Sequence, residues 1–319
     1  MWPMAMLSEP VLVRAPATSA NLGPGFDALG LALALRDEVT ARVAERDVHV
    51  TVTGEGAGEL PTDETHLVVR AMGAAFAALR EQPTGLALEC HNRIPQARGL
   101  GSSSAAIVAG LLAGRSLVVD GAERLPDEEV LRLAAEIEGH PDNVAPCLLG
   151  GFTIAWTEDG GARAVRLTPS PDIRPVLFVP ADRGLTEEAR AALPASVPHA
   201  DAARNTARSA LLVHALTSAS DLLWAATEDR LHQPYRAAGA PATAALVESL
   251  RADGAAAVVS GAGPSVLVLA TPDWTPPEPD GWTVTSMDVD TRGATVTIGS
   301  TSGTVEHAER DPVAAGGAR

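Results

Sequence analysis

Two glycines and three serines follow each other closely in the stretch GLGSSSAA, which runs from Gly99 to Ala106. A long run of small and apolar residues comes directly afterwards, which predicts that a helix begins at the serines. Unpaired N–H groups at a helix N-terminus attract phosphate, and glycines let the backbone approach a ligand closely. The stretch therefore indicates a phosphate-binding loop, although serines that merely cap the helix would give the same pattern.

No lysine accompanies this loop, because all 24 basic residues of the chain are arginines. A Walker-type phosphate loop needs a lysine after its last glycine, and a Rossmann fingerprint needs the spacing G-x-G-x-x-G, which is not found here. These two classes of nucleotide site are excluded. Phosphate binding at this loop would have to rely on backbone amides, hydroxyl groups and a cation.

Polar side chains also gather in the stretch APATSANLGPGFDALG, from Ala15 to Gly30. Asn21 and Asp27 lie there among glycines and prolines, directly after a segment that is typical of a buried strand. Taken alone, the pattern favours an Asx-turn loop with a capping aspartate. Any binding role for these two side chains depends on what lies beside them.

Two glutamates end a predicted helix in the stretch AEIEGHPDNVAP. Glu136 and Glu138 flank its apolar face on opposite sides, so helical spacing does not choose between them as a metal ligand, and solvated surface glutamates would look the same. Asp142 and Asn143 follow in what we expect to be a turn. Farther along, SGAGPS (Ser260–Ser265) joins two apolar strands either as a hairpin connection or as a ligand-facing loop.

Taken together and in this order, the four stretches resemble the motifs of the galactokinase, homoserine kinase and mevalonate kinase (GHMP) superfamily, and most closely those of its homoserine kinases. The likeness spans about Val11 to Ala270. It implies an α+β GHMP kinase fold, with an N-terminal half like ribosomal protein S5 domain 2 over residues 1–168 and a ferredoxin-like half over residues 169–302. The composition of residues 303–319 predicts a disordered tail.

The resemblance implies ATP and Mg²⁺ as cofactors. Mg²⁺ would be held by Ser103 and Glu136, with Glu138 as the alternative carboxylate. His66 stands where relatives have an asparagine that contacts adenine, and an imidazole offers only one donor or acceptor there. The residues implied for ATP are Pro95, Gln96, Ala97, Arg98, Gly99, Leu100, Gly101, Ser102, Ser103, Ser104, Ala105 and His66.

The implied acceptor is the small molecule L-homoserine, phosphorylated to O-phospho-L-homoserine in threonine biosynthesis. Asn21 would contact its hydroxyl and Asp27 its ammonium group, whereas Arg190 and Arg236 would bind its carboxylate through paired N–H bonds. Asn143 would also hydrogen-bond the amino acid. The catalytic residues implied are Asn21, Arg236 and Asn143.

Mevalonate-kinase-like relatives carry a basic aspartate at the position of Asn143. An amide cannot accept a proton, so the resemblance implies phosphoryl transfer without a protein general base. A kinase for another small alcohol and a non-catalytic ligand sensor on the same fold remain as alternatives. Without the resemblance, Arg190 and Arg236 would be interpreted as surface side chains.

The elements that position these residues mix strands and helices without a strict βαβ rhythm, which predicts an α+β fold. Three prolines between Pro169 and Pro175 indicate a domain boundary. We predict helices over residues 65–81, 102–119, 126–140, 185–193, 205–227 and 241–254. We predict strands over residues 11–17, 31–35, 38–45, 47–54, 85–94, 150–156 and 174–181, and two more within 255–270.

The bulk composition limits the partners and the compartment. A formal net charge of −16 argues against nucleic-acid binding. No apolar run approaches the roughly 20 residues of a membrane helix, and no positive charge precedes Arg14, as a secretory signal would require. Two distant cysteines, Cys90 and Cys147, indicate free thiols in a reducing compartment. We therefore expect a cytoplasmic enzyme without nucleic-acid or membrane partners and, from the resemblance, a homodimer.

Overall fold

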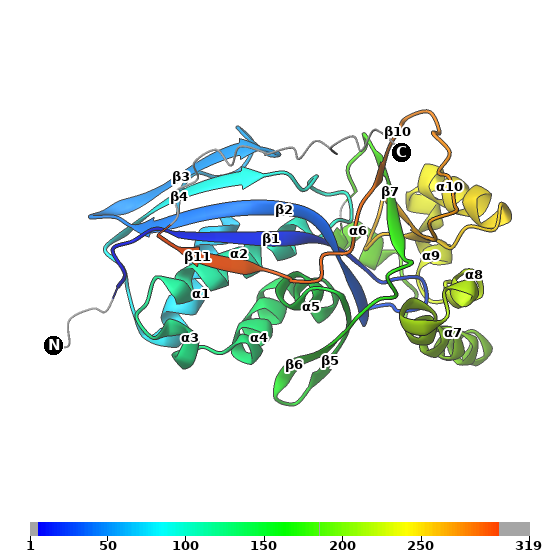
Figure 1. Ribbon diagram of the computed structural model, residues 1–319, viewed down its shortest axis with the longest axis horizontal. Coiled ribbons are helices and arrows are strands. Elements are labelled where there is room, and N and C mark those ends of the chain that lie inside the picture. Colours follow the sequence, from blue (N-terminus) through cyan, green and yellow to red (C-terminus); the bar gives the residue numbers. More distant parts are fainter. Residues whose placement is uncertain (1–5, 185, 300–319) are drawn as a thin grey trace, which may run out of the picture.

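The computed structural model describes residues 6–184 and 186–299. Two β-sheets lie side by side, and each carries its own helices (Figure 1). This mixture of mainly antiparallel strands and helices confirms the predicted α+β class.

The first sheet has seven strands: β1 (Val11–Ala20), β2 (Leu29–Val43), β3 (Asp47–Gly54), β4 (Gly85–Asn92), β5 (Phe152–Glu158), β6 (Gly161–Leu167) and β11 (Thr295–Ile298). Five of them follow the order β11-β1-β2-β4-β3, and β5 branches off β2 to pair with β6. The β3–β4 pair is parallel, whereas the other pairs are antiparallel. The long strand β2 joins the two branches of the sheet, because its first residues pair with β5 and its last residues pair with β4.

Helices cover one face of this sheet (Figure 1): α1 (Leu67–Leu79), α2 (Ser102–Ser116), α3 (Gly121–Arg124), α4 (Asp127–Glu138) and α5 (Pro141–Leu149). The central helix α2 packs against α1, α4, α5 and β1. Gly110 of α2 allows a close approach to α1, because a Cβ there would lie 2.4 Å from the Val68 carbonyl oxygen. The middle of α2 thereby packs closely against α1.

The second sheet has four strands, β7 (Arg174–Pro180), β8 (Ala257–Val259), β9 (Val266–Ala270) and β10 (Trp282–Ser286), in the antiparallel order β10-β7-β9-β8. Between β7 and β8 the chain forms α6 (Thr186–Ala191), α7 (His199–Ser218), α8 (Leu223–Ala226), α9 (Gln233–Arg236) and α10 (Pro241–Ala252). Two 3₁₀ turns, Ser220–Leu222 and Ala237–Gly239, join these helices. A small apolar core that includes Phe178 and Leu250 packs α10 onto the sheet.

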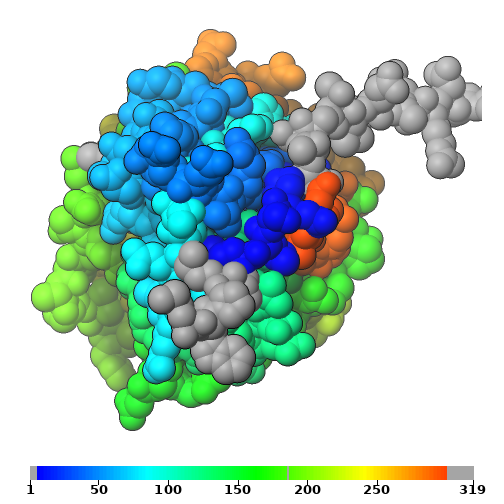
Figure 2. Space-filling model, turned by 90° about the vertical axis from the view of Figure 1, so that its left-hand side faces the viewer, coloured from blue at the N-terminus to red at the C-terminus, as the bar shows by residue number. Residues whose placement is uncertain are grey.

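The two halves are joined by a shared core and by the returning chain. Leu212, Leu216 and Val258 from the second half are buried in the same cluster as the residues of the first sheet. Strand β11 pairs with β1, and Figure 2 shows the orange segment beside the blue one. The predicted C-terminal domain over residues 169–302 is corrected here, because β11 lies in the first sheet. Residues 303–319 lie outside the described residues.

Several predicted elements have different limits in the structure. The two strands predicted at 31–35 and 38–45 form one strand, β2, which continues past a register shift opposite Pro16 and Ala17. The expected turn after Gly139 is instead helix α5, which Pro141 and Asp142 start as favourable first-turn residues. The helix predicted over 205–227 begins earlier, at His199, and ends at Ser218. Within the described residues, no helix is long and apolar enough to cross a membrane.

Candidate active site

The glycine-serine loop lies at the N-terminus of α2 and faces two cavities. Gly101 precedes the helix in a left-handed conformation (φ 69°), and its neighbours supply no side-chain cap. The first N–H groups of a helix have no intrahelical partner, so they are available to a ligand. A Cβ at Gly101 would lie 1.9 Å from Thr18 Oγ1, so the loop can approach β1 this closely only as glycine.

Contacts from both halves of the molecule hold this loop in place. The Thr18 N–H donates to the Leu100 carbonyl at 3.0 Å. Ser260 Oγ, from the turn between β8 and β9, donates to the Gly99 carbonyl at 2.7 Å and lies 2.8 Å from Ser19 Oγ. The turn at 260–265 is therefore both a hairpin connection and a support of the loop.

A cavity of about 350 Å³ lies on one side of the loop and is mostly apolar. His66 caps α1 by accepting the Val68 N–H at its Nδ1 (3.3 Å), while its buried Nε2 has no partner among the described residues. Burial lowers the pKa of His66, so the ring is neutral and Nε2 carries the proton. The cavity therefore offers an unused N–H donor to a ligand such as a nucleotide base.

Asp37 lines the same cavity, and the sequence analysis missed it. Its Oδ1 accepts the N–H groups of Arg93 (2.6 Å) and Ile94 (2.9 Å), directly before the glycine-serine loop. Burial raises the pKa of Asp37 to about 6. Asp37 lies between the two strands predicted at 31–35 and 38–45, and its burial could not be known from the sequence.

The second cavity, of about 250 Å³, lies on the other side of the loop and shares Ala97, Ser102 and Ser103 with the first. Residues from both halves line it. They are Asn21, Ala97, Gly99, Leu100, Gly101, Ser102, Ser103, Glu138, His140 and Asn143 from the first half, and Gly184, Arg190, Arg236, Gly261 and Ala262 from the second. A small polar molecule in this cavity would meet the loop directly.

The two predicted asparagines are held by the protein itself. Asn143 Oδ1 accepts a hydrogen bond from Thr18 Oγ1 (2.8 Å). Asn21, with φ 57°, accepts the Asp27 N–H at Oδ1 (2.8 Å) and donates from Nδ2 to the Gly261 carbonyl (3.1 Å). Because an amide has two N–H groups and two acceptor positions, each side chain retains hydrogen-bonding capacity for a ligand.

Asp27 and Arg190, which we predicted to bind opposite ends of the substrate, bind each other in the structure. Arg190 Nη2 and Nη1 lie 2.7 and 3.1 Å from the two Asp27 carboxylate oxygens. Arg236 lies nearby and is almost fully buried, with Nε donating to the Ala189 carbonyl (3.1 Å) and Nη1 to the Gly261 carbonyl (3.3 Å). The structure thus collects one carboxylate and two guanidinium groups beside the second cavity.

The two candidate glutamates are separated clearly by the structure. Glu138 Oε1 accepts hydrogen bonds from Ser103 Oγ (2.7 Å) and Ser104 Oγ (2.9 Å). Glu136 points to the surface and pairs with Arg132 within α4. The geometry therefore favours Glu138, our alternative, over Glu136 as the carboxylate next to the glycine-serine loop.

The donors near Ser103 fit Mg²⁺. A carboxylate and a hydroxyl are hard oxygen ligands, as this ion prefers. Within residues 6–184 and 186–299, no group of three or more His, Cys, Asp or Glu side chains could hold a metal by itself.

His140 is a second lining residue that we did not predict. Its Nδ1 lies 2.7 Å from Oδ1 of the fully buried Asp142, and this hydrogen bond raises the pKa of His140. His140 lies between Glu138 and Asn143 in the stretch AEIEGHPDNVAP, and this position was the signal that the sequence offered.

Most, but not all, of the predicted ATP residues face a cavity. Arg98 instead donates to the carbonyls of Gln96 and Pro180. Pro95 and Ser104 likewise line neither cavity. Those that line one or both are His66, Gln96, Ala97, Gly99, Leu100, Gly101, Ser102, Ser103 and Ala105.

Comparison with known proteins gives consistent matches. The family model of the GHMP kinases N terminal domain matches residues 66–151, and that of the GHMP kinases C terminal domain matches residues 202–278. The homoserine kinase of Streptomyces coelicolor is 56% identical over 297 residues, covering 92% of this chain and 96% of the relative. The homoserine kinase of Mycolicibacterium smegmatis is 50% identical, covering 86% of this chain and 90% of the relative.

Solved structures also resemble this chain. The crystal structure of homoserine kinase from Cytophaga hutchinsonii superposes with a TM-score of 0.77 at 26% identity, covering 91% of this chain and 98% of that one. Mevalonate diphosphate decarboxylase from Staphylococcus aureus shares the fold at 16% identity, with a TM-score of 0.63 over 91% of this chain and 98% of that one. The chain therefore belongs to the GHMP kinase family and, within it, to the homoserine kinases.

Proposed function

We propose that this chain transfers the γ-phosphoryl group of ATP to the hydroxyl of L-homoserine and forms O-phospho-L-homoserine for threonine biosynthesis. One observation carries the proposal: a cavity with a carboxylate and two guanidinium groups at its edge adjoins the uncapped N-terminus of α2. The high identity to proteins named homoserine kinase supports it.

We propose that the base of ATP occupies the apolar cavity and that its phosphates lie over the first turn of α2. The His66 Nε2–H would donate to the base, and the backbone amides after Gly101 would bind phosphate oxygens. Ser103 and Glu138 would hold Mg²⁺, which when bound offsets the negative charge of the phosphates. This role of Glu138 follows from its contact with Ser103.

The acceptor side suits a zwitterion. Asp27 and Arg190 form an exposed pair that a substrate can replace, with its ammonium group on Asp27 and its carboxylate on Arg190. Arg236 is fixed by two backbone carbonyls and would bind the same carboxylate. A sugar or mevalonate offers no ammonium group for Asp27.

We propose that none of the described side chains that line the second cavity, hereafter the acceptor cavity, removes the hydroxyl proton. The carboxylate among them, Glu138, already accepts hydrogen bonds from Ser103 and Ser104. Thr18 occupies one acceptor position of Asn143, so this amide is free mainly to donate and to orient the hydroxyl. The hydrogen bond to Asp142 raises the pKa of His140 and thus favours its protonated form. We propose that the proton passes to an oxygen of the transferred phosphoryl group while the new O–P bond forms and the bond to ADP breaks.

The substrate assignment is tested by ADP release from Mg-ATP with L-homoserine, D-homoserine, mevalonate and galactose. We expect turnover with L-homoserine and little with the other three. Preference for another alcohol would show a different kinase of the family, and nucleotide binding without turnover would show a sensor.

The absence of a protein base is tested by pH–rate profiles. Asn143→Ala should lower kcat/KM by about 10²-fold through lost orientation, without removing a limb of the profile. Loss of the acidic limb in His140→Gln would identify His140 as the base and contradict the proposal.

A homodimer stays a prediction of the resemblance, and a cytoplasmic location stays a prediction of the composition. Sedimentation velocity at micromolar protein concentration tests the dimer.

A further inference from the structure

A fully buried histidine, His232, lies behind the acceptor cavity between α8 and α9. Its Nε2 lies 2.8 Å from the Gly23 carbonyl and 3.2 Å from the Asn21 carbonyl, and its Nδ1 lies 3.1 Å from Arg236 Nη1. Carbonyls only accept and a guanidinium only donates. The ring is therefore neutral, with its proton on Nε2.

This one ring contacts two parts of the acceptor cavity. It holds the turn that carries Asn21 and it holds Arg236, and both of these side chains also donate to the Gly261 carbonyl. Phe26 stacks on His232, with ring centroids 5.3 Å apart, and lies under the guanidinium groups of Arg190 and Arg236. A displacement of His232 would move the groups that face the substrate hydroxyl and carboxylate.

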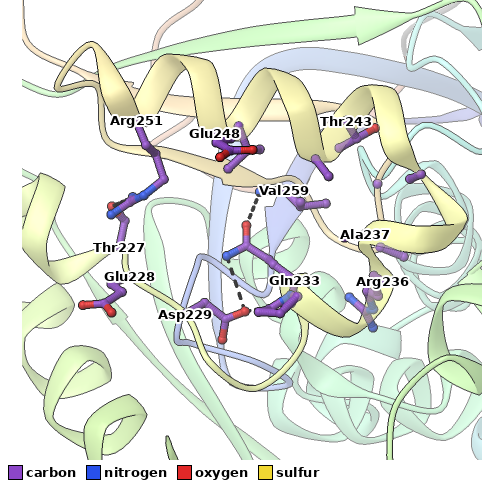
Figure 3. Close-up of a pocket in the computed structure, with 16 residues that line it drawn as sticks. Thr227, Glu228, Asp229, Gln233, Arg236, Ala237, Thr243, Glu248, Arg251 and Val259 are labelled. Atoms are coloured by element: carbon purple, nitrogen blue, oxygen red, sulfur yellow. Dashed lines mark hydrogen bonds between the residues drawn. The ribbon is translucent and has the colours of Figure 1, made fainter.

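The segment that carries His232 is itself fixed. Asp229 accepts the N–H groups of Leu231, His232 and Gln233. Gln233 Oε1 accepts the Val259 N–H at 2.7 Å, so the segment is tied to β8. Figure 3 shows Gln233 between Asp229 and Val259, with Arg236 farther along the same segment. Contacts within the protein thus fix the segment that carries the ring.

We propose that His232 is a positioning residue that sets Arg236 for the substrate carboxylate through Nδ1 and Asn21 for the hydroxyl through Nε2. The proposal rests on the proposed function, because it assigns a role in that same site. This role requires a neutral ring, because a proton on Nδ1 would take up the lone pair that accepts the hydrogen bond from Arg236.

The surroundings favour the neutral ring. Burial lowers the pKa of His232. The charged groups around it are Asp229, whose Oδ2 is 3.5 Å from Nε2, Arg236 on its own segment, and the Asp27–Arg190 pair beyond Phe26. The positive charge of Arg236 disfavours a second positive charge on the His232 ring, and the carbonyls of the N-terminal loop carry no formal charge.

Two substitutions separate the two contacts. His232→Gln places a nitrogen near Nε2 and loses the acceptor for Arg236, so we expect KM for L-homoserine to rise about tenfold with a smaller change in kcat. His232→Asn places an oxygen near Nδ1 and loses the donor to the Asn21 turn, so we expect kcat to fall about tenfold with a smaller change in KM. KM for ATP should stay within about twofold in both variants. The control is His214→Asn, at an exposed position of α7.

An unchanged KM for L-homoserine in folded His232→Gln, or equal increases in both KM values, would overturn the proposal. If the variants do not fold, ¹⁵N NMR of the wild-type imidazoles decides. We expect the Nε2–H tautomer of His232 from about pH 6 to about pH 8, and an Nδ1–H or doubly protonated ring would overturn the proposal. The NMR result does not depend on turnover, whereas absence of homoserine phosphorylation by the wild-type chain would refute the proposed function itself.

Discussion

At the scale of single residues, two carboxylates of one helix have different surroundings. Glu138 accepts hydrogen bonds from Ser103 and Ser104 of the glycine-serine loop, while Glu136 forms a surface pair with Arg132. Exposed ion pairs of this kind contribute little to stability and nothing to a site on the other side of the helix.

We expect Glu138→Gln to lower kcat by about 10²-fold and to raise the Mg²⁺ concentration needed for half-maximal rate, because a neutral amide is a poorer ligand for the ion. Glu136→Gln is the matched control and should stay within about twofold of wild type. Steady-state rates over a Mg²⁺ titration measure both. A larger effect at Glu136 would reverse the assignment.

Asp37 provides a prediction about pH. Its pKa is raised from 3.8 to about 6 by burial in the folded chain, so the folded state holds this proton more tightly than the unfolded state does. Unfolding then releases a proton, and stability falls as the pH rises through this range. Between about pH 4.5 and about pH 7, the ionisation of Asp37 should lower the free energy of unfolding by about 2 kcal/mol.

Asp37→Asn removes this titration and keeps an oxygen for the Arg93 and Ile94 amides. Urea unfolding of both proteins at the two pH values should show the wild type losing about 2 kcal/mol more than the variant. Parallel pH dependence in the two proteins would contradict the shifted pKa.

At the scale of elements, one glycine before a helix and another in the middle of the neighbouring helix have opposite roles. Gly101 before α2 has a positive φ and no space for a Cβ, whereas Gly73 within α1 faces open space. Gly101→Ala should cost about 2 kcal/mol of stability and weaken ATP binding, because the loop must move away from Thr18.

Gly73→Ala should instead stabilise the chain by about 0.5–1 kcal/mol, because alanine loses less entropy in a helix. Thermal melts and nucleotide titration measure both variants. Normal ATP affinity in Gly101→Ala would show that the close approach of the loop to β1 is not needed for binding.

At the scale of the whole molecule, a buried ion pair lies where the chain returns from the second half to the first sheet. Asp290 precedes β11, pairs with Arg36 of β2, and accepts the N–H groups of Arg292 and Gly293. Its side chain is 4% exposed. This contact fixes the C-terminal strand onto the N-terminal sheet.

Asp290→Ala should lower the free energy of unfolding by about 3 kcal/mol, because it leaves a buried charge and two amides unpaired. Asp288→Ala removes an exposed pair with Arg174 and should cost less than about 0.5 kcal/mol. Denaturant unfolding measures both, and KM values near wild type in both variants would show that the active site is unaffected. A small effect at Asp290 would mean that β11 is held mainly by its backbone.

The sequence alone was sufficient for the family and the α+β class. The order of GLGSSSAA and the stretches around Asn21, Asn143 and Gly261 carried these predictions, and the absence of lysine excluded a Walker site. Helices α1, α2 and α4 were predicted within a few residues, because their apolar spacing and flanking glycines are local signals.

Only the tertiary structure decided which polar side chains meet. It favoured Glu138 over Glu136, paired Asp27 with Arg190, placed β11 in the first sheet, and showed His140, Asp37 and His232 around the site. These outcomes depend on contacts between residues far apart in the chain. Local spacing determines the face of a helix on which a side chain lies, but the burial and the partners of that side chain are determined by the elements packed against it.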